Sequence, residues 1–141
     1  MCIRDSCDPR PEYASGWEIE GTEFSTVAAH ELVTHFAPDP HSIVLALAHA
    51  PRLEDEALAR ALETDAFYIG ALGSHKNQQA RIRRLRKLGL TNTQLAKLHG
   101  PVGLDIGSHT PAEIAIAITA ALVQARNQPS QLQTEVESRH A

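Results

Sequence analysis

The chain has 141 residues, of which 43% are apolar and 21% charged, and a formal net charge of −4; these values fit one globular domain with a real core. The negative charge argues against a general nucleic-acid-binding protein, and no apolar run approaches the roughly 18 residues of a membrane span. Two cysteines, Cys2 and Cys7, are too few for a disulfide framework, and the first residues contain no secretory signal. We therefore expect a cytoplasmic protein.

Apolar runs alternate with segments of helical periodicity along most of the chain. Residues 7–21 predict a loop, because prolines and glycine interrupt them without any periodicity. After them we expect a helix at 27–36, a strand at 42–48, a helix at 53–63, a strand at 66–72, a helix at 75–88, a short helix at 91–98 and a long helix at 111–126. The strand segments lack polar alternation, which is typical of parallel strands covered on both faces. This order predicts an α/β domain whose ligands bind at the carboxyl ends of its strands, at 48–50, 71–74 and 102–108.

Two segments, 66–85 and 100–115, share a pattern: an apolar run, glycines, a Ser-His pair and the start of a helix. Glycines let backbone N–H groups approach a ligand closely, and the dipole of the following helix favours negative charge there. The second helix begins with Thr110, a proline and Glu113, the residues of a capping box. Both segments therefore predict sites suited to a phosphate or another anion.

Basic side chains crowd the helix expected at 75–88. Lys76 and Arg81 lie near enough to its start to reach a ligand at the glycine loop. The remaining basic residues predict a solvated face or a docking patch for an acidic partner: Arg83, Arg84, Arg86 and Lys87. The acidic residues 54–56 are explained by favourable electrostatics at the start of a helix.

The spacing of the eight histidines contains no pair typical of a metal site, so we expect no bound metal. His49, His75 and His109 follow strand-end or loop positions and could line a pocket together. No nucleophile elbow or pair of carboxylates suggests catalysis. We therefore expect a protein that is not an enzyme.

Asp8 and Arg10 allow two interpretations. An Asp-Pro pair commonly initiates a turn, whereas in dinucleotide-binding folds an acidic residue after the second strand binds ribose and a nearby Arg can meet a phosphate. The residues before Asp8 are too few and too polar to predict a strand or a glycine-rich fingerprint. The turn is the favoured interpretation.

Four segments together resemble one known family. In chain order they read CDPRPEYA, LALAHAPRLEDEAL, FYIGALGSHKNQQARIRRL and LHGPVGLDIGSHTPAEIAIAI. They resemble the C-terminal domain of the XdhC/CoxI family, accessory factors of molybdenum hydroxylases such as xanthine dehydrogenase, over residues 7–127. The resemblance implies a Rossmann-like parallel sheet with flanking helices, without the family's first strand, glycine loop and first helix.

The resemblance also implies a chaperone that binds the molybdenum cofactor, helps its sulfuration and delivers it to a xanthine dehydrogenase-type apo-enzyme. A cysteine desulfurase and a second copy of the chain are further partners that it allows. The alternatives are the nucleotide-binding portion of an NAD(P)-dependent oxidoreductase and a non-functional fragment that folds poorly.

By position, the resemblance places Asp8 and Arg10 at the end of the family's second strand and His49 at the end of its fourth. Where the family usually has His-Asp-Pro, this chain has Ala50 after His49, so an acidic group is missing there. The phosphate-side loop and the loop that closes the pocket, at 101–107, would use Gly70, Gly73, Ser74, Arg81, Gly103 and Gly107.

The resemblance also predicts the domain boundaries. We expect residues 1–6 to be a non-native leader, 7–127 a partial Rossmann-like domain and 128–141 a flexible tail. Without the central first strand, the neighbouring strands would expose apolar edges.

Overall fold

The computed structural model describes residues 5–128. The chain divides into two compact units, Met1–Pro101 and Val102–Ala141. Residues 1–4 with Cys2, and residues 129–141 of the tail expected at 128–141, lie outside the described residues.

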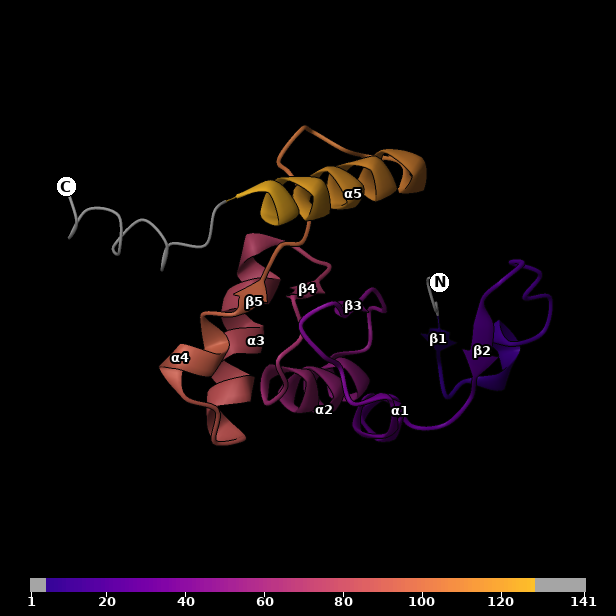
Figure 1. The fold of residues 1–141 in the computed structure, drawn as a ribbon, viewed down its shortest axis with the longest axis horizontal. Helices are drawn as coiled ribbons and strands as arrows, with labels where there is room; N and C mark the ends of the chain where they lie inside the picture. Colours follow the sequence, from indigo (N-terminus) through magenta and orange to yellow (C-terminus); the bar gives the residue numbers. More distant parts are fainter. Residues whose placement is uncertain (1–4, 129–141) are drawn as a thin grey trace. The chain divides into compact units, whose positions relative to one another are not determined.

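The first unit alternates short strands and helices, as the sequence predicts. Its elements are β1 (Asp5–Cys7), a 3-10 helix (Pro11–Tyr13), β2 (Glu23–Ser25), α1 (Ala29–Phe36), β3 (Ile43–Ala46), α2 (Pro51–Leu62), β4 (Tyr68–Ala71), α3 (His75–Lys87), α4 (Asn92–Leu95) and β5 (Leu98–His99) (Figure 1). The second unit contains α5 (Pro111–Asn127). The expected α/β class is confirmed.

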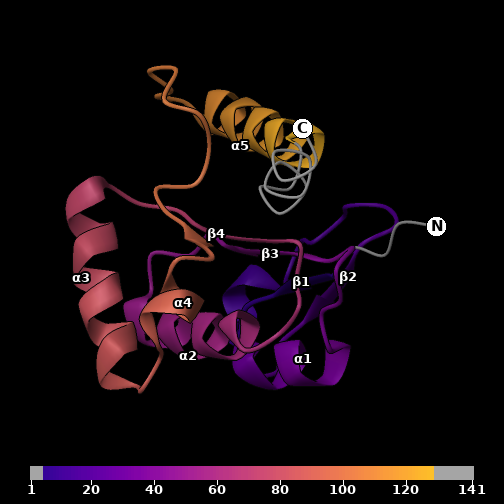
Figure 2. The same ribbon diagram turned by 60° about the vertical axis from the view of Figure 1, so that its left-hand side comes forward.

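The core of the first unit lies against a three-stranded parallel sheet in the order β3-β4-β5. All four residues of β4 are buried, because this central strand has a neighbour on each side. Helices α1 and α2 pack against each other (Figure 2). The core cluster combines side chains of β4 and β5 with side chains of the helices: Leu58, Leu62, Ile69, Ala71, Leu85 and Leu98.

Strands β1 and β2 form a separate parallel sheet, in which Asp5 pairs with Glu23 and Cys7 with Ser25. The expectation that no strand precedes Asp8 is therefore wrong. Pairing with β2, some 18 residues further on, makes this short polar segment a strand, and such tertiary pairing overrides local propensity. Trp17 packs against Phe24 of β2, with ring centroids 4.9 Å apart.

Strand β3 is an edge strand, since within the described residues it pairs only with β4. Ile43 within it is 46% exposed, and Leu47 directly after it is 49% exposed. β3 thus presents an exposed apolar edge within the described residues.

The last strand differs from its prediction. Residues 98 and 99 form β5, paired with β4 through Ile69 and Leu98, whereas we expected a helix to 98 and a strand end at 102–108. The helix α4 stops at Leu95. A two-residue strand has no periodicity of its own, so its pairing partner decides its structure.

Helix ends follow the predicted capping chemistry. Thr91 and Gln94 form the capping box of α4, and Thr110 and Glu113 form that of α5. Gly89, with φ of +94°, follows the end of α3, where a left-handed glycine is common.

In the second unit, Gly103 lies against α5. The Leu104 N–H donates to the Ala117 carbonyl at 3.1 Å, and a Cβ on Gly103 would come within 3.2 Å of the α5 backbone. Within residues 5–128, no helix is both long and apolar enough to cross a membrane.

Candidate anion-binding loop

Residues 72–74 connect β4 to α3 in a tight turn. The Leu72 N–H donates to the Ala46 carbonyl at 2.9 Å, so the turn starts as a continuation of the sheet. Gly73 has φ of +141°, and a Cβ there would lie 3.3 Å from the Asn77 Cβ. Both the backbone conformation and the close approach of α3 therefore favour glycine at this position.

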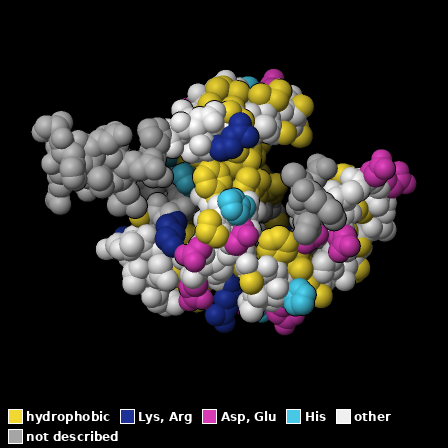
Figure 3. Space-filling view, in the orientation of Figure 1, with side chains coloured by type: hydrophobic (Ala, Val, Ile, Leu, Met, Phe, Trp, Pro, Cys, Tyr) yellow, Lys and Arg dark blue, Asp and Glu magenta, His cyan; other side chains and the backbone are white. Residues whose placement is uncertain are grey.

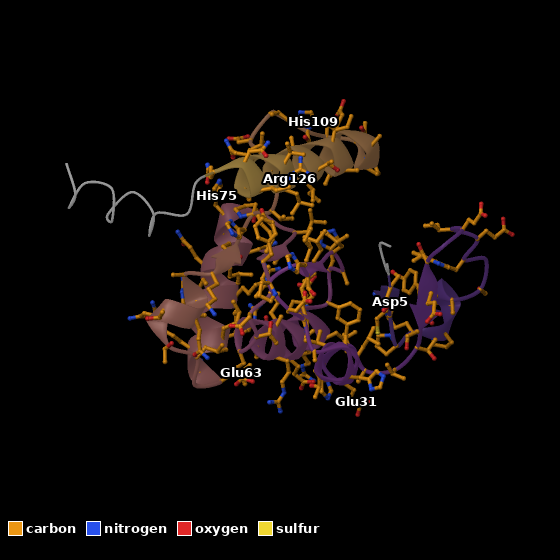
Figure 4. The ribbon with its side chains drawn as sticks, in the orientation of Figure 1. Asp5, Glu31, Glu63, His75, His109 and Arg126 are labelled. Atoms are coloured by element: carbon orange, nitrogen blue, oxygen red, sulfur yellow. The ribbon has the colours of Figure 1, made fainter. Side chains whose placement is uncertain are left out.

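Ser74 caps α3, because its hydroxyl accepts a hydrogen bond from the Asn77 N–H at 3.2 Å. The first turn of α3 contains no acidic residue, and both His75 and Lys76 are exposed. Figure 4 shows His75 at the start of α3, at the opposite end of the α2–α3 layer from Glu63. The loop thus combines a glycine turn, a helix N-terminus and an exposed lysine, which is a favourable environment for an anion.

Arg81 is not exposed at this loop. The residue is only 4% exposed, and one guanidinium nitrogen, Nη2, donates both to Glu54 Oε2 at 3.0 Å and to the Leu72 carbonyl at 2.9 Å. Nη1 donates to Gln78 Oε1 at 2.9 Å. The expectation that Arg81 belongs to the phosphate-side loop stays a prediction, but its guanidinium contacts the backbone of the loop from inside the protein.

Arg84 forms a second ion pair between α3 and α2, with Asp55, through both Nε and Nη2. This hydrogen-bonded carboxylate raises the pKa of Arg84. Arg84 still lies at the surface, with its side chain 39% exposed, and its charge is paired with Asp55; its role in a docking patch stays a prediction. On the face shown in Figure 3, acidic and basic side chains of the described residues are interspersed rather than gathered in one basic patch.

Asp8 and Arg10 bind each other. The Arg10 guanidinium donates to both carboxylate oxygens, at 2.8 Å and 2.6 Å, and the Arg10 backbone N–H donates to Oδ1 at 3.0 Å. These bonds lower the pKa of Asp8. A carboxylate that accepts from the N–H two residues further on is an Asx turn, so the geometry agrees with the turn interpretation. Arg10 also lies over the Tyr13 ring, 4.4 Å from its centroid.

The first unit does not bring all of the predicted site residues to one loop. Gly70 lies within β4, between Leu45 of β3 and His99 of β5, so it is a strand residue and not part of the turn. His49 is exposed, three residues after β3 ends. Their predicted roles in binding stay predictions.

Cys7 is a poor candidate for a reactive thiol. Its Sγ donates to the Val27 carbonyl at 3.0 Å, and burial together with the neighbouring Asp8 raises its pKa. A raised pKa keeps the side chain in its less nucleophilic thiol form. Within residues 5–128, no group of three or more His, Cys, Asp or Glu side chains could hold a metal ion.

The second glycine loop lies in the second unit. Gly103 supports α5 there, and Gly107 has φ of +75° with open space around its Cβ position. The Glu113 carboxylate accepts from the N–H groups of His109 and Thr110, at 2.7 and 2.9 Å, which lowers the pKa of Glu113. A carboxylate of this chain therefore already occupies the two backbone donors that directly precede α5.

Glu54 and Gln78 are important for the first loop and were not predicted to be so. Both hydrogen bond to Arg81. A signal was present, because the acidic residues 54 and 55 are adjacent while Arg81 and Arg84 are three apart on one helical face. Acidic residues on one helix and arginines on another indicate that ion pairs join the two helices, but they do not show which acidic residue binds which arginine.

Residues 5–122 match the family described as the XdhC Rossmann domain. The chain belongs to this family. Its parallel strands with flanking helices are accordingly those of a Rossmann-like domain, and the resemblance seen in the sequence is confirmed.

Three relatives come from two bacteria. The chain is 40% identical over 72 residues to the uncharacterized protein YqeB of Escherichia coli, covering 51% of this chain and 13% of that protein. It is 28% identical over 88 residues to the molybdenum cofactor insertion chaperone PaoD of E. coli, covering 62% of this chain and 28% of that protein. A protein of Bacillus subtilis, named as a probable subunit of xanthine dehydrogenase, is 26% identical over 120 residues, covering 84% of this chain and 34% of that protein.

A solved structure shares the fold. A crystal structure of a xanthine dehydrogenase from Bacillus halodurans matches 92% of this chain and 37% of its own, with a TM-score of 0.74 and 30% sequence identity. The chain thus spans about a third or less of the length of the three bacterial relatives.

Proposed function

We propose that the chain is part of an accessory protein that binds the molybdenum cofactor and delivers it to a xanthine dehydrogenase-type enzyme. The observation that carries the proposal is the similarity to a protein named as a molybdenum cofactor insertion chaperone, over 62% of this chain. The relatives named as xanthine dehydrogenase proteins support the same class of client enzyme.

The chemistry of the first glycine loop supports this proposal. The cofactor is a pterin that carries a phosphate, and a phosphate needs hydrogen-bond donors and positive potential. Gly73 leaves the backbone of the turn open, the start of α3 offers N–H groups, and Lys76 adds a positive charge. In this proposal the loop holds the phosphate of the cargo, and the pterin lies along the carboxyl ends of the strands.

The alternative is binding of NAD(P). In dinucleotide-binding folds a free carboxylate after the second strand binds the ribose, whereas here Asp8 is occupied by Arg10. This occupation favours the cofactor-binding proposal over a nicotinamide nucleotide.

Titration of the purified chain with molybdenum cofactor and, separately, with NAD(P) tests the proposal. We expect binding of the molybdenum cofactor, and transfer to a xanthine dehydrogenase-type apo-enzyme measured by recovery of its activity. Tight NAD(P) binding with turnover, and no affinity for the pterin, would contradict the proposal.

Ser74→Asp tests the loop itself. Aspartate also caps helices, so α3 is retained, but a negative charge now faces the phosphate, and we expect affinity for the cofactor to fall about tenfold. Thr91→Asp is the matched control, because it makes the same kind of change at the cap of α4. Equal affinities of the two variants would mean that the loop does not hold the anion.

A further inference from the structure

Arg81 is the centre of a buried polar network. Its guanidinium donates to the Glu54 carboxylate, the Leu72 carbonyl and the Gln78 amide oxygen, at 3.0, 2.9 and 2.9 Å. The side chains of Arg81 and Glu54 are each only 5% exposed. The fixed directions of the guanidinium N–H groups hold such a buried arginine in place as much as its charge does.

The partners of Arg81 come from the segments that follow two neighbouring strands, β3 and β4. Glu54 lies in the first turn of α2, which follows β3, and Leu72 comes directly after β4. Gln78 in turn lies against Gly100, which follows β5, so closely that a Cβ on Gly100 would overlap the Gln78 side-chain amide. Arg81 thus links the segments after β3 and β4, and Gln78 connects this network to the segment after β5.

We propose that Arg81 is a positioning residue for the anion-binding loop and does not itself contact the anion. It holds the Leu72 carbonyl, and this carbonyl precedes Gly73, with its positive φ, and the capping residue Ser74. The turn is therefore kept in one conformation before any ligand arrives, which lowers the entropy lost on binding. Only the identity of the anion rests on the proposed function; the positioning of the turn does not.

The unpaired atoms of the network agree with a positioning role. Within the described residues, Arg81 Nε and Glu54 Oε1 are buried without a hydrogen-bond partner. A buried ion pair with unsatisfied atoms is a poor way to stabilise a protein, since apolar side chains often do as well or better. The ion pair of Arg81 and Glu54 instead has a role in holding the Leu72 carbonyl in position.

A second ion pair offers a matched control. Asp55 and Arg84 also join α2 to α3, one turn along α3, but no hydrogen bond of Arg84 reaches residues 72–74 within the described part of the chain. Breaking either pair loosens the same helix contact. Breaking only the pair of Arg81 releases the turn.

The experiment measures amide hydrogen exchange of the full chain without ligand. For Glu54→Gln and Arg81→Lys we expect exchange at the hydrogen-bonded amides of the turn, those of Leu72, Asn77 and Gln78, to rise about tenfold relative to core amides of β4. Lysine keeps the charge but cannot reach the same set of acceptors. For Asp55→Asn and Arg84→Lys we expect exchange at these residues to stay within about twofold of the native chain.

Gly100→Ala provides a milder variant that removes no charge. The added methyl group displaces the Gln78 amide, which is the end of a flexible side chain, and so removes one partner of Arg81. We expect a smaller rise in exchange at the same residues, with folding retained. If the substitutions at Glu54 or Arg81 unfold the protein, the proposal is tested with Gly100→Ala alone.

Affinity for inorganic phosphate, followed through the amide signals of residues 73–76, separates positioning from direct contact. Positioning predicts that Arg81→Lys, Glu54→Gln and Gly100→Ala all weaken binding. A loss confined to Arg81→Lys would make Arg81 a direct ligand and overturn the proposal, as would equal exchange in the Glu54 and Asp55 variants. The expected exchange pattern without any binding of the molybdenum cofactor would instead contradict only the proposed function.

Discussion

Gly73 illustrates how one residue decides whether a loop can bind an anion. Its φ of +141° and the neighbouring Asn77 Cβ both disfavour a side chain. The same lack of a side chain leaves the backbone of the turn accessible, so structural and binding requirements coincide at this residue.

Gly73→Ala should therefore lower both stability and anion affinity. We expect the free energy of unfolding to fall by about 1–3 kcal/mol, the usual range for a strained backbone conformation, measured by urea denaturation. Gly89→Ala is the control, because Gly89 also has positive φ, +94°, but nothing lies within 4 Å of its Cβ position. If the two variants lost phosphate affinity equally, the turn would have no special role.

Two ion pairs of the first unit have different structural roles. Asp8 and Arg10 lie two residues apart and mainly define a local turn. Glu54 and Arg81 lie 27 residues apart and join two helices to a loop. Sequence proximity reveals the first pair, whereas the second depends on the packing of α2 against α3.

At the scale of elements, β4 and β5 are joined by a stacked pair of aromatic side chains. Tyr68 and His99 lie with ring centroids 4.1 Å apart and an interplanar angle of 7°. Partial desolvation lowers the pKa of His99 below its ordinary value of 6.5, although the residue keeps contact with solvent. The neutral imidazole is therefore the form that this pairing favours.

The lowered pKa of His99 predicts acid sensitivity of the fold. At a pH well above 6.5, His99 is neutral in both the folded and the unfolded protein, so its titration does not affect stability. As the pH falls below 6.5, the unfolded protein binds a proton at His99 more readily than the folded protein, whose His99 pKa is lower. The free energy of unfolding therefore decreases until the pH is below both pKa values. His99→Phe retains the stack, so we expect its unfolding midpoint to fall less between pH 7 and 5. Parallel pH profiles of the two proteins in thermal unfolding would contradict this assignment.

The elements differ in how well sequence reasoning predicts them. The apolar run at 66–72 is a correctly predicted strand because all four residues of β4 are buried, which leaves no polar alternation. The run at 42–48 also contains a strand, β3, although this edge strand is partly exposed. The helix caps at Ser74, Thr91 and Thr110 depend only on residues up to three positions away, so the sequence predicts where these helices begin. Strands β1, β2 and β5 were missed because pairing with distant residues creates them.

In the candidate site, too, local features were predicted from the sequence and features set by packing were not. The glycine turn and the start of α3 follow from neighbouring residues and were predicted. The inward direction of Arg81, the pairing of Arg84 and the position of Gly70 inside β4 depend on how helices and strands pack. Spacing along the chain cannot distinguish a guanidinium that faces a ligand from one that holds the loop.

At the scale of the whole molecule, the described residues form two units, and the proposed site is built entirely within the first. Its helices and strands are those of the family to which the chain belongs. The fold of the family therefore provides the scaffold for the loop chemistry that we propose for the cofactor.

The Arg81 network has a consequence for engineering this domain. Because Glu54 and Leu72 must both meet the Arg81 guanidinium, and Gly100 must lie against its partner Gln78, the connections after β3, β4 and β5 have little freedom in length. Inserting two glycines between α2 and β4, at residues 63–66, should leave cofactor binding within about threefold, since short surface insertions at the opposite edge add little loop entropy. The same insertion at residues 47–50 should abolish binding while the chain still folds, as judged by circular dichroism. Length variation should thus be tolerated at one edge of the sheet and excluded at the other.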